Sequence, residues 1–92
     1  MVHIEIFKQL GGNKFLAMTG AKNLVYTANS LGMKLPRNAG KVTFLTITLN
    51  SMDLYTMEFY NVKAKLVNTI ENVYCDQLRK LFEDQTGMYT SL

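Results

Sequence analysis

The side chains in this sequence that are suited to binding chemistry are mainly basic and aromatic, and the basic ones are unevenly distributed. Residues 1–52 hold six Lys or Arg residues against Glu5 alone, whereas residues 53–92 hold four against six acidic residues. Such an asymmetry is typical of proteins that contact nucleic acid or another acidic partner. The candidate contact residues are Lys14, Lys22, Tyr26, Lys34, Arg37 and Lys41.

Three of these candidates flank one predicted loop around Pro36 and Gly40, and we expect them to converge at an edge of the sheet. They are Lys34, Arg37 and Lys41. An open alternative is that the basic residues are solvated side chains on separate loops, because none is adjacent to another in the sequence.

Residue sets for catalysis and metal binding are missing from the sequence. One His and one Cys cannot supply zinc-ligand spacing. A Ser–His–acid triad would have to use His3, which we expect to be a solvated residue near the chain terminus. The two Gly-containing segments, residues 11–14 and 20–23, lack the frame of a phosphate-binding loop. We therefore expect no catalytic, cofactor-binding or metal-binding residues.

Size and composition favour one small domain that spans residues 1–92. The hydrophobic content of 48% excludes intrinsic disorder. A chain of this length buries only roughly 60–65% of its unfolded surface. Six Met and ten aromatic residues are many for so small a core. We therefore expect that part of this apolar surface serves a subunit interface, for example in a homodimer. The single cysteine, Cys75, excludes an intramolecular disulfide. The sequence has no apolar run long enough to indicate a membrane span. A cytoplasmic protein is expected.

The elements that must position the candidate residues are mostly strands. Residues 41–67 alternate β-branched and aromatic residues with polar ones around the break at residues 50–53, which predicts a strand–turn–strand unit. The alternation of Val62, Ala64 and Leu66 predicts that this strand continues with those side chains facing the core. Residues 24–35 predict another hairpin around Asn29 and Ser30.

The N-terminal segment has two interpretations and the segment after it has one. Val2, Ile6 and Leu10 share a helical face and Gly11 ends it, which favours a helix, although the alternation of residues 2–6 also fits a strand. The apolar run at residues 15–18 predicts a short strand.

The C-terminal segment predicts an amphipathic helix. Leu78, Leu81 and Phe82 share one helical face with Tyr74, with Cys75 at its edge as a weakly reactive structural thiol, and Gly87 follows the helix. The predicted fold class is therefore α+β: a short N-terminal helix, about five mostly antiparallel strands, and an amphipathic C-terminal helix packed on the sheet.

Three segments resemble a family of small uncharacterised proteins encoded by bacteriophages and other bacterial mobile elements. They are residues 9–23, residues 47–55 and residues 86–90. The resemblance implies a phage or mobile-element gene expressed in the cytoplasm of a bacterial host. Small proteins of that origin commonly act by binding, including as inhibitors of host defence such as anti-CRISPR proteins, and this functional step is an analogy.

Three functional hypotheses follow. The first is a non-enzymatic binding protein that acts on a protein partner, suggested by the missing catalytic set and the many Met and aromatic residues. The second is a nucleic-acid-binding accessory protein that uses the basic N-terminal half. The third is an enzyme whose site is shared between subunits. Salt dependence separates the first two, because phosphate-driven binding weakens steeply as salt rises.

Overall fold

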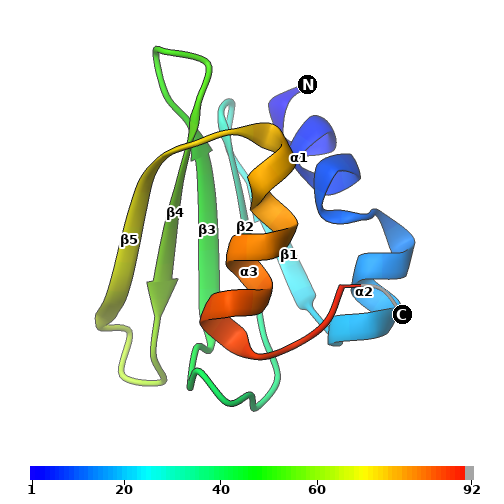
Figure 1. Ribbon diagram of the computed structural model, residues 1–92, viewed down its shortest axis with the longest axis vertical. Coiled ribbons are helices and arrows are strands. Elements are labelled where there is room, and N and C mark those ends of the chain that lie inside the picture. Colours follow the sequence, from blue (N-terminus) through cyan, green and yellow to red (C-terminus); the bar gives the residue numbers. More distant parts are fainter. Residues whose placement is uncertain (91–92) are drawn as a thin grey trace.

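Five antiparallel strands form one sheet in which the spatial order is the order of the sequence, β1-β2-β3-β4-β5. The computed structural model describes residues 1–90, shown in Figure 1. The strands are β1 (Lys22–Tyr26), β2 (Ser30–Lys34), β3 (Phe44–Leu49), β4 (Tyr55–Tyr60) and β5 (Leu66–Val73). The helical elements are α1 (Val2–Leu10), α2 (Asn13–Thr19), the 3-10 turn η1 (Cys75–Gln77) and α3 (Leu78–Thr86). The predicted α+β fold class is confirmed.

Helices cover one face of this sheet. Figure 1 shows α3 crossing that face with α1 beside it. Leu45 and Ile47 of β3 and Met57 and Phe59 of β4 point toward the helices and are fully buried. The alternate residues between them are only partly buried, so the second face is open to solvent. This pattern is the usual one for an antiparallel sheet with a single covered face.

The N-terminal segment is a helix, as the sequence favours, but residues 15–18 also lie in a helix rather than in the predicted strand. In α2, Phe15 and Thr19 are one turn apart and both buried, and the Thr19 hydroxyl donates to the Phe15 carbonyl at 2.8 Å. Gly20 ends α2 with a left-handed φ of 74°. An unbroken apolar run has no period of its own, so packing on the core decides between strand and helix.

The predicted strand through residues 62–66 is also wrong, because residues 61–65 form the turn between β4 and β5. The Asn61 side-chain oxygen accepts hydrogen bonds from the N–H groups of Lys63 and Lys65, at 2.9 and 3.1 Å. Val62 is 81% exposed instead of facing the core. An Asn side chain that binds the backbone ahead of it offers the chain an alternative to the strand ladder.

The C-terminal helix packs as predicted, but it begins later. Leu78 and Phe82 are fully buried, and Gly87 ends α3 with a left-handed φ of 75°. Tyr74 and Cys75 precede the regular helix and are exposed, so the expected structural role of the Cys75 thiol is wrong. Tyr74 is extended and Cys75 lies in the 3-10 turn, so neither residue occupies the buried face that regular α-helical spacing would give it.

Candidate functional site

Two loops lie side by side at one end of the sheet, at the bottom of Figure 1. One is the β2–β3 loop, residues 35–43, and the other is the β4–β5 turn, residues 61–65. Gly40 and Lys41 of the first loop line the same hollow as Val62, Lys63 and Lys65 of the second. The two loops therefore form one continuous surface.

The β2–β3 loop is held in a defined conformation by one side chain. The Asn38 amide donates to the carbonyls of Pro36 and Val42, at 2.8 and 2.6 Å, and its oxygen accepts from the Val42 N–H at 3.1 Å. These bonds close the loop on itself, so little backbone ordering is left to occur when a partner binds.

The same loop is fixed to the C-terminal end of α3. The Gly40 N–H donates to the Thr86 carbonyl at 3.2 Å, and a Cβ on Gly40 would collide with the Gln85 carbonyl oxygen. Lys41 follows with a φ of 57°, which is unusual for a residue other than Gly, Asn or Asp. Packing of the neighbouring Gly40 thus constrains the backbone from which the Lys41 side chain projects.

Six basic residues gather at this end of the sheet. Lys22 lies opposite Lys34 in the β1–β2 ladder, Arg37 and Lys41 come from the β2–β3 loop, and two further lysines come from the β4–β5 turn. We call this surface the basic end: Lys22, Lys34, Arg37, Lys41, Lys63 and Lys65. All six side chains are exposed, and none forms an ion pair within residues 1–90.

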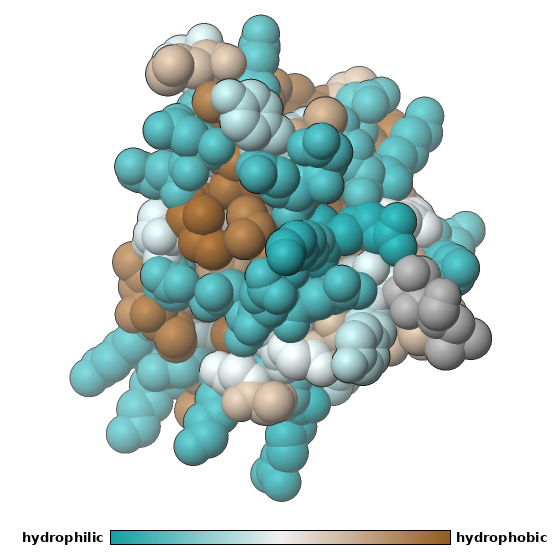
Figure 2. Space-filling model, viewed as in Figure 1, coloured by the Kyte–Doolittle hydropathy of each residue, from teal (hydrophilic) through white to brown (hydrophobic). Residues whose placement is uncertain are grey.

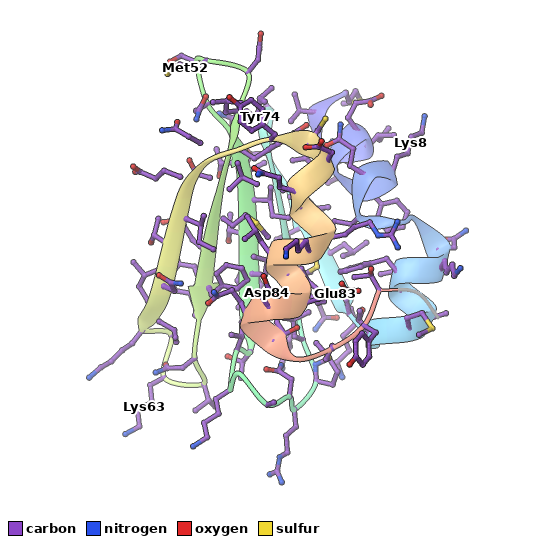
Figure 3. The ribbon with its side chains drawn as sticks, viewed as in Figure 1. Lys8, Met52, Lys63, Tyr74, Glu83 and Asp84 are labelled. Atoms are coloured by element: carbon purple, nitrogen blue, oxygen red, sulfur yellow. The ribbon has the colours of Figure 1, made fainter. Side chains whose placement is uncertain are left out.

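The figures show how this end differs from the opposite one. Long hydrophilic side chains project from the lower end of the molecule in Figure 2. Figure 3 shows Lys63 pointing away from the sheet at the lower end, while Met52 lies at the upper end. Among the described residues, 1–90, no acidic side chain lines any of the three hollows around Val62. The basic end therefore carries a concentrated positive charge, which attracts anions.

An apolar hollow lies beside the basic end on the open face of the sheet. Its volume is about 590 Å³, and its walls include Lys34, Leu35, Phe44, Tyr60, Val62 and Ala64. We call it the aromatic hollow. Phe44 and Tyr60 are directly opposite in the β3–β4 ladder, with ring centroids 6.5 Å apart. Gly32 leaves room for the Phe44 ring, since a Cβ there would lie 3.1 Å from it.

The Tyr60 phenol has a charged neighbour on the same strand. Glu58 lies two residues before Tyr60 in β4, so both side chains are on the open face. Desolvation raises the pKa of Tyr60, and the charge of the Glu58 carboxylate and its hydrogen bond with the phenol raise it further. The phenol therefore stays protonated at neutral pH, and its O–H donates a hydrogen bond to the Glu58 carboxylate.

The structure brings together four of the six residues predicted as contacts. Lys22, Lys34, Arg37 and Lys41 belong to the basic end, whereas Lys14 lies in α2. Tyr26 lies at the far end of β1, where its ring stacks on that of His3 at 3.8 Å. The expectation that His3 is simply a solvated terminal residue is therefore wrong.

Four residues of the site were not among the predicted contacts: Phe44, Tyr60, Lys63 and Lys65. Asn61 was the available signal for the two lysines. The β3–β4 turn, residues 50–54, and the β4–β5 turn, residues 61–65, have the same hydrogen bonds. In each, the side-chain oxygen of the first Asn accepts from the backbone N–H groups two and four residues ahead. The second Asn thus marks a turn whose lysines lie at the end of the sheet.

No group of three or more His, Cys, Asp or Glu side chains within residues 1–90 is arranged to hold a metal ion. In the same part of the chain, no helix has the length and apolar character needed to cross a membrane. Comparisons of this chain with protein-family models, with curated proteins and with solved structures found no significant match.

Proposed function

We propose that this chain is a non-enzymatic nucleic-acid-binding protein whose contact surface is the basic end. The observation that carries the proposal is that six exposed basic side chains from three separate segments meet at one end of the sheet. Lysine and arginine side chains that contact phosphates release condensed counterions, which drives binding without regard to sequence.

The backbone of the basic end also supports this proposal. The Asn38 and Asn61 side chains hold the two loops, and Gly40 fixes one of them to α3. Lys41, Lys63 and Lys65 are thus presented from ordered backbone, and binding orders mainly their side chains. An origin in a bacteriophage or another mobile element, in a bacterial cytoplasm, is part of the proposal and fits an accessory protein of this kind.

The test is the salt dependence of binding to a labelled oligo-thymidine strand, measured by fluorescence anisotropy between about 50 and 200 mM salt. Five or six phosphate contacts with a single strand predict a slope of log affinity against log salt of about −3.5 to −4. The variant K41N/K63S should reduce the slope by about 1 to 2. Asn is chosen at position 41 because it tolerates the left-handed backbone there.

The matched control is the variant K8S/K80S, which removes the same charge from α1 and α3. It should leave the slope within the error of the unchanged protein. Equal effects of the two double variants would show that net charge alone, rather than the basic end, governs binding. Absence of salt-sensitive binding by the unchanged protein would refute the proposal.

A protein partner is the second candidate function, and one observation favours it. Val62, Leu66 and Val67 are 81%, 52% and 49% exposed in and beside the β4–β5 turn. Exposed apolar side chains at one place are typical of protein interfaces. Under this hypothesis V62S would abolish capture of a host protein, whereas oligo-thymidine affinity would be negligible at physiological salt.

A further inference from the structure

We infer that the aromatic hollow accepts an unpaired nucleobase, so that the basic end binds single-stranded nucleic acid in preference to duplex. This inference rests on the proposed function. The observation that carries it is that two aromatic rings, Phe44 and Tyr60, lie in a hollow beside the basic end, with Lys34 in the same wall. Proteins that bind single strands combine a basic track for the backbone with aromatic side chains for the bases.

The hollow has the character that a flat aromatic ligand needs. Its volume of about 590 Å³ falls within the range of roughly 300–1,000 Å³ of small-molecule sites. Leu35, Val62 and Ala64 add apolar wall to the two rings. Phe44 and Tyr60 are partly rather than fully buried, so their rings contribute to the surface of the hollow.

The charges around the hollow indicate how a strand would lie. Lys34 is in its wall, and Lys41 and Lys63 line the adjoining hollow beyond Val62. These cations are placed to contact phosphates on the way into and out of the aromatic hollow. Glu58, by contrast, sits beside Tyr60 and repels a phosphate at that position. The neutral part of a nucleotide, its base, therefore belongs next to Tyr60.

The preference for single strands follows from base accessibility. In a duplex both faces of every base are covered by stacking, so an aromatic ring cannot stack on them and only the backbone and the groove edges of the bases remain accessible. A duplex also has the higher charge density, and electrostatics alone would make it the tighter ligand. Preference for a single strand therefore requires contacts with bases. Loss of one base stacked on an aromatic ring reduces affinity about tenfold.

The experiment compares three probes of equal length at one salt concentration: an oligo-thymidine strand, a duplex, and a strand of abasic sugar-phosphate units. The unchanged protein should bind oligo-thymidine about tenfold more tightly than the abasic strand, and more tightly than the duplex by a smaller factor. The variant Y60A should lose this advantage while its affinity for the abasic strand stays the same. Y60F retains the ring without the hydroxyl and should keep most of the advantage.

The outcomes separate this inference from the proposed function. Salt-sensitive binding of similar strength to all three probes would overturn the base-binding inference and leave the proposed function standing. Failure of all three probes to bind would overturn both. Because the abasic strand measures folding and charge contacts in every variant, a misfolded Y60A would lose abasic binding and be recognised. In that case the inference is tested by comparing the affinities of the unchanged protein for oligo-thymidine and for the abasic strand. Equal affinities overturn the inference.

Discussion

The ring of Phe15 in α2 meets the ring of Phe82 in α3 edge to face, with 5.0 Å between the two centroids. Both side chains are fully buried. Phe82→Ala should therefore cost about 3–5 kcal/mol, which is most of the stability of a domain this small. Urea titration followed by circular dichroism measures the change. F82L, which retains most of the volume, should cost clearly less, and a loss under about 1 kcal/mol for F82A would contradict the packing described.

The same pair shows where sequence reasoning succeeds and fails. The apolar spacing of Leu78 and Phe82 predicts the buried face of α3 correctly, because 3.6-residue periodicity is a local property. Phe15 lies in a run without such a period, and the ring against which it packs, Phe82, is far along the sequence. The β3–β4 hairpin is predictable because its strands alternate around a polar turn.

The candidate site was predictable only in part, for a similar reason. Lys34, Arg37 and Lys41 are neighbours in the sequence, so their convergence follows from one loop. Lys63 and Lys65 join them through the β4–β5 turn. In the sequence, these two lysines alternate with Val62 and Ala64, and that alternation is also the pattern of a strand. The meeting of the two loops also depends on Gly40 packing against α3, a tertiary contact that no local pattern reveals.

Ala64 adopts a left-handed φ of 59° in the β4–β5 turn, and Asp53 adopts 60° at the equivalent place in the β3–β4 turn. The left-handed region costs roughly 1–2 kcal/mol for a residue with a Cβ, and less for Asp. A64G removes this cost but adds the larger conformational entropy that Gly loses on folding. The net effect should be a stabilisation of the fold by about 0.5–1 kcal/mol. D53G is the control and should change stability less. Urea midpoints measure both, and a destabilising A64G would contradict the turn geometry.

Cys75 is exposed in η1, so its thiol should react with a small thiol reagent in the native protein at nearly the rate found in urea. Absorbance of the released chromophore follows the reaction. Protection of native Cys75 by a large factor would mean that this residue is covered, either by α1 or by a second copy of the chain. Repeating the measurement across protein concentrations separates these two causes.

Glu83 should make stability depend on acid pH. Its carboxylate accepts from the Thr90 N–H at 2.8 Å and from the Thr90 hydroxyl at 3.0 Å. The backbone bond is the main cause that lowers the pKa of Glu83, against a smaller opposing effect of desolvation. A carboxyl whose pKa is lower when folded stabilises the protein above its unfolded pKa, about 4.3, and loses that contribution as the pH falls through the folded pKa.

The matching measurement compares E83Q with the unchanged protein in urea at several pH values. E83Q should be less stable near pH 7, and the difference should shrink once the pH falls below about 4. D84N is the control, because Asp84 is the next residue of α3, labelled in Figure 3, and its side chain is exposed. A stability difference for E83Q that is constant with pH would contradict a specific role for the carboxylate.

The basic end is tested most directly by mapping backbone amide signals of isotope-labelled protein during titration with oligo-thymidine. If the basic end and the aromatic hollow bind the strand, the largest chemical-shift changes fall in residues 34–44 and 60–66. The β3–β4 turn, residues 50–54, has the same Asn-centred hydrogen bonds but lies at the opposite end of the sheet, so its signals should not move. Shifts centred on that turn or on the helices, or no shifts at all, would contradict the account.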